Sequence, residues 1–337
     1  MSAPIGIGLL GTGRIGRLHA RLIANDVPGL ALSAVYDVDP EAARELADAL
    51  GVEVASSPEA VMEHPGTDAV AICTSTDTHV DLLVRAAAVG KPVFLEKPVS
   101  LDLAEVDRGL AASEQAGLYV QLGFNRRFDP AHASVREAVA AGEVGDVHLV
   151  RISSRDPEPP PLSYVQVSGG IFLDMTVHDF DMARFVTGSE VDEVYALGDV
   201  RVDPAIGEAG DVDTAVVVLR HEDRTLTVID NSRRSAYGFD QRVEALGSAG
   251  MAASHNPLAH TGTVSTRAGT RMPPLPRFFV ERYVPSYLAQ WGAFERAMRS
   301  GGEPPVTAAD GRAALVLGLA AWRSLREGRP VRTTEIG

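Results

Sequence analysis

An aspartate and a histidine four residues apart are the pair of side chains best suited to chemistry. Asp174 and His178 lie in the segment 169–185, and on a helix this spacing places both on one face. Because histidine titrates near pH 6.5, His178 can accept a proton from an alcohol while Asp174 stabilises the imidazolium. The residues alone leave two alternatives open. Asp174 caps a helix beside a buried core histidine, or both bind a metal with Asp181; that ligand set is poor, and we expect no metal.

A lysine stands at a second position where ligands commonly bind. Lys97, in the sequence Glu96-Lys-Pro98, directly follows the apolar run Val93–Leu95, which predicts a buried strand. In a parallel sheet this places Lys97 at the carboxyl edge, where ligands bind. The position alone also fits a solvated surface lysine.

Three glycines predict a dinucleotide site close to the N-terminus. They follow the apolar run Ile5–Leu10 and open a stretch with helical spacing. In this context Gly11 permits a tight turn, Gly13 lets the backbone approach a pyrophosphate, and Gly16 lets the helix pack closely. The helix N-terminus adds free N–H groups and a positive dipole. The residues predicted to contact the cofactor here are Gly11, Thr12, Gly13, Arg14, Ile15 and Gly16.

An acidic residue at the end of the next predicted strand selects the cofactor. Asp37 comes 21 residues after Gly16 (37 − 16), where a carboxylate receives the adenosine ribose hydroxyls and repels a 2′-phosphate. The next residue is Val38 rather than an arginine. We therefore expect NAD rather than NADP.

The elements that must position these groups alternate between strands and helices up to residue 123. This alternation predicts a doubly wound parallel sheet covered by helices, an α/β Rossmann domain. The expected strands are Ile5–Leu10, Leu30–Tyr36, Ala69–Cys73, Val93–Leu95 and Tyr119–Leu122, and the expected helices are Ile15–Ala24, Pro40–Leu50, His79–Val89 and Leu103–Gln115.

The pattern changes after that point, and successive strands between 191 and 253 predict a large open, mainly antiparallel sheet. We expect two domains, a cofactor-binding domain over 1–123 and an α+β substrate domain over 124–337. Further expected elements are helices at Pro130–Ala141, Asp174–Val186, Arg277–Arg299 (broken or kinked at Pro285) and Ala308–Glu327, and a strand at Val147–Ser154.

Composition excludes several classes of partner. With 45 acidic and 31 basic residues among 337, the formal net charge is −14, which repels nucleic acid and anionic membranes. A small neutral substrate fits this surface. The single cysteine, Cys73, allows neither an intramolecular disulfide nor a cysteine-rich zinc site. No signal peptide precedes the first strand and no apolar run is long enough to span a bilayer, so we expect a soluble, cytoplasmic protein.

Taken together, these segments resemble the glucose–fructose oxidoreductase/inositol dehydrogenase/rhizopine-catabolism family over nearly the whole chain, and most closely its bacterial inositol 2-dehydrogenases. The resemblance rests on 11–16, on Glu96-Lys-Pro98, on Gly123-Phe-Asn-Arg-Arg-Phe-Asp129, on Ser154-Arg-Asp-Pro157, on 168–181 and on Phe279-Val-Glu-Arg-Tyr283. Lineage-specific variation is expected in 156–162 and 266–276.

The resemblance implies roles for individual residues. Lys97 would bind the reacting hydroxyl and touch the nicotinamide ribose, His178 would accept its proton, and Asp174 would assist His178 and bind the polyol. Contacts to the nicotinamide side are implied for Thr74, Ser75, His79 and Glu96, and contacts to the polyol for Asn125, Arg126, Arg127, Asp156 and Tyr237. Which of the two arginines faces the pocket stays open.

The implied reaction is NAD-dependent oxidation of a secondary alcohol of a cyclic polyol, with myo-inositol first. Alternatives within the family are scyllo-inositol or an aldose such as glucose, and outside catalysis a silent NAD-binding sensor. The resemblance also implies a homotetramer that uses the open sheet.

Overall fold

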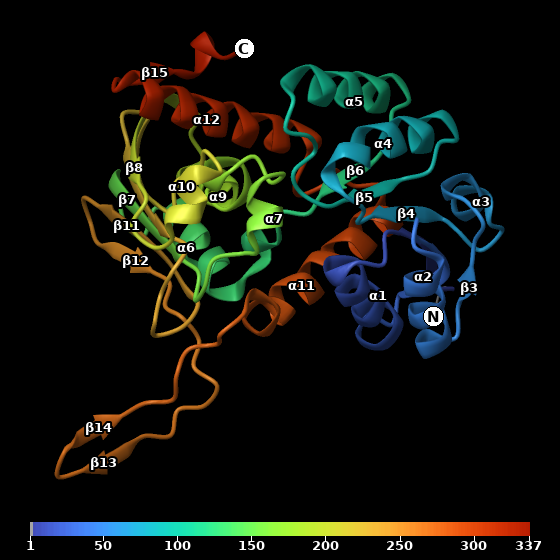
Figure 1. The fold of residues 1–337 in the computed structure, drawn as a ribbon, viewed down its shortest axis with the longest axis horizontal. Coiled ribbons are helices and arrows are strands. Elements are labelled where there is room, and N and C mark those ends of the chain that lie inside the picture. The colour runs from blue at the N-terminus through green and yellow to red at the C-terminus, as the bar shows by residue number, and fades with distance from the viewer. Residues whose placement is uncertain (1–2) are drawn as a thin grey trace. The chain divides into compact units, whose positions relative to one another are not determined.

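The chain folds as two compact units (Figure 1), and the computed structural model describes residues 3–337. Unit 1 contains the chain up to Asn125 together with Ser286–Ala313, and unit 2 contains Arg126–Pro285 and Ala314–Gly337. The units are therefore not contiguous in sequence, since 286–313 returns to the first. The predicted domain boundary at residue 123 stays a prediction. No sequence pattern indicated that 286–313 belongs to unit 1.

Unit 1 is built on the expected parallel sheet. Its strand order is β3-β2-β1-β4-β5-β6, and every neighbouring pair is parallel. Strands β4 to β6 are buried along their whole length, as an apolar run covered on both faces should be. The strands are β1 (Ile5–Leu10), β2 (Leu30–Tyr36), β3 (Glu53–Val54), β4 (Ala69–Ile72), β5 (Val93–Leu95) and β6 (Val120–Leu122).

The helices of unit 1 begin in two different ways. Asp39 and Asp102 cap α2 and α5 with their side chains, whereas α1 begins after Gly13 without a side-chain cap. The first N–H groups of α1 thus remain available to a ligand. The helices are α1 (Arg14–Asp26), α2 (Pro40–Leu50), α3 (Pro58–Glu63), α4 (His79–Ala88), α5 (Leu103–Gln115) and the short η1 (Thr76–Thr78) and η2 (Asn125–Phe128), the last of which crosses into unit 2.

Unit 2 contains the predicted open sheet. Its order is β12-β11-β7-β10-β9-β8-β15, in which only β7 and β10 run parallel and the other neighbours are antiparallel. The predicted fold class, an α/β Rossmann unit plus an α+β unit, is confirmed. The strands are β7 (Val147–Arg155), β8 (Val191–Asp199), β9 (Thr214–His221), β10 (Leu226–Ser232), β11 (Asp240–Gly247), β12 (Met251–Ala253) and β15 (Val331–Arg332).

Helices α6 and α9 pack against one face of this sheet at β7 and β11 (Figure 1). Helix α11 is continuous through Pro285, so the expected break is not seen, although the division between the units falls at that residue. The remaining helices are α6 (Pro130–Ala140), α7 (Leu162–Val165), α8 (Ile171–Asp174), α9 (Val177–Thr187), α10 (Pro204–Glu208), α11 (Phe279–Ser300), α12 (Ala308–Glu327) and η3 (Thr333–Glu335).

A two-stranded hairpin extends away from the sheet of unit 2 (Figure 1). Its strands β13 (Val264–Thr266) and β14 (Gly269–Arg271) pair only with each other, and all six residues are exposed. Within 3–337, no helix has the length and apolar character needed to cross a membrane.

Candidate functional site

The three glycines of the first loop differ in what surrounds them. Gly11 adopts a φ of +93°, and a Cβ there would lie 2.5 Å from the Cys73 carbonyl oxygen. At Gly16 a Cβ would lie 2.0 Å from the Gly11 oxygen, whereas at Gly13 it would meet no atom within 4 Å. Gly11 and Gly16 thus make the turn and the helix packing possible, while the backbone at Gly13 faces open space.

Asp37 is held in place by the glycine loop. Its Oδ2 accepts hydrogen bonds from the backbone N–H of Thr12 at 2.5 Å and from the Thr12 hydroxyl at 3.0 Å, and its Oδ1 accepts the N–H of Asp39 at 2.9 Å. Burial by itself would raise the pKa of Asp37, but these hydrogen bonds outweigh it and lower the pKa below its usual value. The adjacent Val38 is 87% exposed. An ionised, oriented carboxylate at this point suits two ribose hydroxyls and disfavours a phosphate.

The loop after β4 presents Thr74 and Ser75, while His79 lies beneath it. The His79 ring is buried, with Nδ1 2.8 Å from the Pro98 carbonyl oxygen and Nε2 3.1 Å from that of Thr74. Burial lowers its pKa despite these two acceptors. In this arrangement His79 ties the loop to the segment after Lys97, and exposed Ser75 is better placed to meet a ligand.

Lys97 lies two residues beyond β5, at the carboxyl edge of the parallel sheet, and is half-buried. Its backbone N–H donates to Oε2 of the buried Glu96 at 3.1 Å. Asn125, also in unit 1, is buried and donates its side-chain amide to Ser286 Oγ at 3.2 Å.

In unit 2, the segment with Asp174 and His178 is not one helix, so the predicted helix Asp174–Val186 was wrong in that respect. Helix α8 ends at Asp174 and α9 begins at Val177, with the N–H of His178 bonded to the Met175 oxygen at 3.3 Å. Thr176, not Asp174, is the residue before α9. Asp174 and His178 are both half-buried, which keeps them accessible to a small molecule.

The carboxylate of Asp174 is oriented by two groups. It accepts the Tyr164 hydroxyl at 2.9 Å and faces the guanidinium of Arg233 at 3.3 Å. Arg233 is only 1% exposed and also faces Asp211 at 3.5 Å. Asp211 in turn accepts the N–H of Ile171, the first residue of α8. Arg233 and Asp211 therefore hold both ends of the short helix that carries Asp174.

Sequence reasoning missed Arg233, and the sheet register shows why it matters. Strands β7 and β10 are parallel with Arg155 opposite Ser232, so they end side by side. The next residues are Asp156 and Arg233, and the Asp156 N–H donates to the Ser232 oxygen at 2.9 Å. The one signal in the sequence was the arginine pair 233–234 at a strand end, which is equally typical of a surface.

The half-buried Asp156 experiences opposing influences from its neighbours. Its pKa is raised to about 6, because burial, together with the negative charge of Asp174, outweighs the opposing charges of Arg233 and Arg126. The carboxyl thus titrates close to neutrality. A group of this kind can accept or donate a hydrogen bond to a hydroxyl.

The two neighbouring arginines 126 and 127 serve different partners. Arg126 is buried and donates to Asp179 Oδ1 at 2.7 Å and to Ser154 Oγ at 2.9 Å. Its positive charge also acts on Asp156, so it belongs to the group around that carboxyl. Arg127 pairs through Nε and Nη2 with Asp181. Asp181, the third ligand of the metal alternative, is thus held by an arginine.

Tyr237 lies in the connection between β10 and β11 and is 54% exposed. Its hydroxyl donates to Asp240 at 2.7 Å and accepts from Arg155 at 2.8 Å. The phenol is thereby fixed close to the ends of the same strands.

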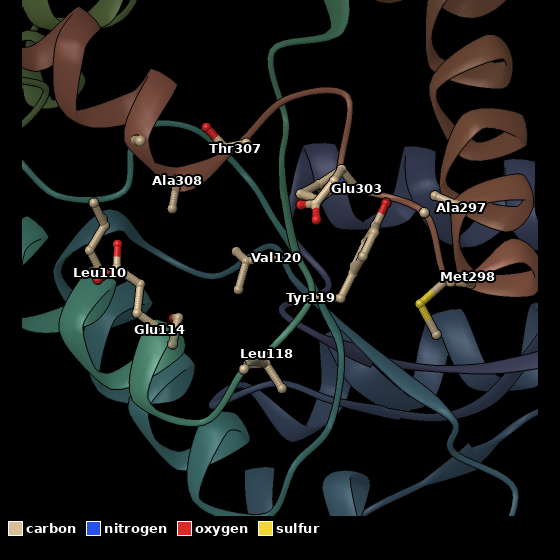
Figure 2. Close-up of a pocket in the computed structure, with 16 residues that line it drawn as sticks. Leu110, Glu114, Leu118, Tyr119, Val120, Ala297, Met298, Glu303, Thr307 and Ala308 are labelled. Carbon is tan, nitrogen blue, oxygen red and sulfur yellow. The ribbon is translucent and has the colours of Figure 1, made fainter.

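A cavity of about 620 Å³ also lies in unit 1, between the end of α5, β6 and the ends of α11 and α12 (Figure 2). Leu118, Val120 and Met298 give it apolar walls, and Glu114 and Glu303 add acidic groups. None of the predicted site residues lines it. The cavity is therefore separate from the groups described above.

Residues 5–124 match the family model of oxidoreductases with an NAD-binding Rossmann fold, GFO/IDH/MocA, and residues 132–253 match the C-terminal domain of the same family. The chain belongs to this family and is an NAD-dependent oxidoreductase. The predicted family and the predicted cofactor are confirmed.

Three relatives are informative. A protein of Thermotoga maritima named myo-inositol 2-dehydrogenase is 48% identical over 98% of this chain and 99% of its own length. An inositol 2-dehydrogenase of Rhizobium meliloti is 44% identical over 96% of this chain and 98% of its own. The structure of a scyllo-inositol dehydrogenase from Lactobacillus casei, with NAD(H) and scyllo-inositol bound, superposes with a TM-score of 0.92 at 32% identity, covering 98% of this chain and 99% of that one.

Proposed function

We propose that this protein oxidises myo-inositol to 2-keto-myo-inositol with NAD, using Lys97, Asp174 and His178 as catalytic residues. The observation that carries the proposal is the arrangement in unit 2. A half-buried histidine follows a carboxylate that is oriented by Arg233 and Tyr164, next to the titrating carboxyl Asp156. Such a set of acceptors and donors suits a ring rich in hydroxyl groups.

Residues of unit 1 hold the cofactor. The N–H groups at the start of α1 bind the pyrophosphate, and the open space at Gly13 admits it. Asp37, fixed by Thr12, receives the adenosine ribose. Bound NAD supplies the hydride acceptor. The remaining contacts in this proposal come from Arg14, Ile15, Val38, Thr74, Ser75, His79, Glu96 and Lys97.

Three residues of the proposal act on the proton and the charge of the reacting hydroxyl. His178 takes the hydroxyl proton of the reacting carbon as its hydride leaves, and Asp174 stabilises the resulting imidazolium. The Lys97 ammonium stabilises the charge that develops on the same oxygen. Since Arg233 and Tyr164 hold Asp174, its carboxylate needs little reorganisation during the reaction.

The remaining hydroxyls are bound by polar groups that are oriented by neighbouring side chains. Asp156, with a pKa of about 6, is mainly a carboxylate at neutral pH and accepts from the polyol. Arg126, Arg127, Asn125 and Tyr237 complete the proposed substrate contacts. An isomer that leaves one of these groups unpaired loses roughly 1–3 kcal/mol of binding, which gives stereochemical preference.

Myo-inositol is favoured over other polyols because two of the relatives at 44–48% identity are named as inositol 2-dehydrogenases, one of them for the myo isomer. Scyllo-inositol is the second candidate, because the Lactobacillus casei enzyme with that ligand keeps the same fold at 32% identity. An aldose remains the third.

We also propose a homotetramer, supported by two surfaces of unit 2. The outer face of the sheet exposes an apolar residue on each of five strands, namely Leu197, Val216, Leu226, Leu246 and Met251. The hairpin β13–β14 lies in the segment 245–280, which contains three arginines and no acidic residue in a chain of net charge −14. A basic arm therefore suits an acidic second copy. A cytoplasmic location is proposed from the acidic composition and the lone Cys73.

The test is an absorbance assay of NADH formation with purified protein, NAD or NADP, and myo-inositol, scyllo-inositol, D-chiro-inositol or glucose. We expect the largest kcat/KM for myo-inositol with NAD. Turnover of another polyol alone would change the assigned substrate but leave the proposed reaction unchanged. No turnover of any of the four compounds, with NADH binding intact, would favour a catalytically silent NAD-binding sensor instead.

A further inference from the structure

A series of buried hydrogen bonds in unit 1 leads from the aromatic core to the backbone of Lys97. Trp291 on α11 donates its indole N–H to Nδ1 of His19 at 2.9 Å. Nε2 of His19, on α1, lies 2.7 Å from Oε1 of Glu96, and Oε2 of Glu96 accepts the Lys97 N–H at 3.1 Å. Trp291, His19 and Glu96 are all buried. Three side chains far apart in the sequence thus form a series that ends at one backbone group.

The indole fixes the tautomer of His19. An indole N–H is a donor only, so Nδ1 of His19 must present its lone pair and Nε2 must carry the hydrogen. A second proton on His19 would set two N–H groups against each other. His19 is therefore a neutral donor to Glu96 rather than half of an ion pair. Both oxygens of Glu96 accept hydrogen bonds, which corresponds to its carboxylate form.

Packing leaves these groups little freedom. The His19 ring makes edge contacts with Phe94 at 5.1 Å and Tyr287 at 5.4 Å between centroids, in addition to Trp291 at 5.5 Å. On the other side, a Cβ at Gly123 would lie 3.0 Å from the Glu96 carboxyl. The Glu96 carboxylate is thus enclosed between the His19 ring and the backbone of Gly123.

We propose that His19 and Trp291 are positioning residues for the dehydrogenase reaction: they hold the Glu96 carboxylate, and so keep it from capturing the Lys97 ammonium. The proposal rests on the function proposed above for Lys97. A buried carboxylate that loses the His19 N–H keeps only one donor and must find another. The nearest cation in sequence is the adjacent Lys97, whose ammonium would then be drawn away from the reacting oxygen.

Four variants test this. His19→Leu removes both the donor and the acceptor, and His19→Gln restores one of each. Trp291→Phe removes only the indole N–H and keeps an aromatic ring. Tyr119→Phe is the matched control, since it removes one donor, bonded to Gln121, from an aromatic residue packed on the same Phe294 as Trp291.

For His19→Leu we expect kcat to fall by about tenfold or more, with the Kd for NADH and the KM for the polyol changed by less than about twofold. His19→Gln should recover most of kcat. Trp291→Phe should lower kcat by less than His19→Leu does, because it removes only the group that fixes the His19 tautomer. Tyr119→Phe should match the parent protein.

Lysine NMR gives a readout that does not depend on turnover. The chain has only two lysines, Lys91 and Lys97, so lysine labelled at the side-chain terminus yields two signals. Lys91 donates to the Thr67 carbonyl oxygen and serves as the internal reference. His19→Leu should move the Lys97 signal and leave that of Lys91 in place.

Two results would overturn the proposal. One is an unchanged kcat, pH profile and Lys97 signal in His19→Leu, with only a lower Tm, which would make the series purely structural. The other is a His19 ring that, in ¹⁵N-histidine spectra of the parent protein, carries its hydrogen on Nδ1 rather than on Nε2. If the parent protein turns over no polyol, the proposed function fails, while both NMR measurements still decide whether His19 holds Glu96 away from Lys97.

Discussion

The two units prepare their ligand groups in different ways. In unit 1, the groups proposed to bind the cofactor are mostly backbone, namely the free N–H groups of α1 and a glycine with open space around it, together with one carboxylate held by Thr12. In unit 2, the groups proposed to bind the polyol are charged side chains that hold one another, with Arg233 between Asp174 and Asp211. The groups proposed to bind the cofactor are therefore local in sequence, and those proposed to bind the polyol depend on tertiary pairing.

The largest effect is expected from a substitution in unit 2 that leaves the cofactor groups of unit 1 unchanged. His178→Ala should lower kcat by about 10²- to 10⁴-fold, because general base catalysis is lost. The Kd for NADH, measured by fluorescence titration, should stay within about twofold of the parent value. His148→Ala is the matched control, since His148 is exposed on β7 of the same unit. Full activity in His178→Ala would remove the assigned base.

The reverse case is a substitution in unit 1 that leaves unit 2 unchanged. Asp37→Ser removes the carboxylate proposed to accept the ribose hydroxyls, and kcat/KM for NAD should fall by about tenfold or more. The ratio of kcat/KM for NAD to that for NADP should fall further, because the repulsion of a 2′-phosphate is also lost. Initial rates with each cofactor measure both. Asp48→Asn, an exposed position on α2, should leave the ratio unchanged, and an unchanged ratio in Asp37→Ser would contradict the assignment.

A smaller effect sharpens the role of tertiary pairing. Arg233→Met leaves Asp174 without its guanidinium partner, and we expect kcat/KM for the polyol to fall by about tenfold while NADH binding is retained. Arg233→Lys should recover part of the loss. Arg234→Met, at the exposed neighbouring position, is the control. A loss of NADH binding in Arg233→Met would show that the two halves are not separable.

The smallest effect concerns stability and pH. Because the pKa of Asp156 is raised to about 6 in the folded protein, the folded state keeps a proton that the unfolded chain releases at lower pH. The charged carboxyl is thus a cost above pH 6, and this cost is relieved as pH falls toward the ordinary range of an aspartate. Asp156→Asn should raise stability at neutral pH by on the order of 1 kcal/mol, a value discounted for a half-buried group.

Thermal unfolding of both proteins across this pH range measures it. The difference in Tm should be largest above pH 6 and should shrink as the pH falls below it. A difference that grows on acidification would mean that the carboxylate is stabilised rather than strained in the folded protein.

The sequence predicted what depends on neighbours along the chain. The glycine loop, Asp37 at the end of β2 and Lys97 after β5 follow from strand and helix patterns, and the alternation of β2, β4 and β5 with helices gave the parallel sheet. Among the elements of unit 1, β3 and α3 were not predicted, because two and six residues are too few to show a period.

What it could not predict depends on pairing across the fold. Arg233 acts only because β7 and β10 are parallel and end together, a register that no local pattern encodes. The break between α8 and α9 was hidden because Asp174 and His178 keep a helical spacing across it. Likewise, the return of 286–313 to unit 1, and with it Trp291 beside His19, is a long-range contact.

The central claim, that hydride passes from a polyol carbon to NAD, is tested most directly with myo-inositol deuterated at carbon 2. The NADH formed by the purified protein would be examined by proton NMR at C4 of the nicotinamide. The proposed reaction predicts one deuteron at C4 for each molecule of inositol oxidised. NADH without deuterium, or no NADH while the cofactor still binds, would contradict it.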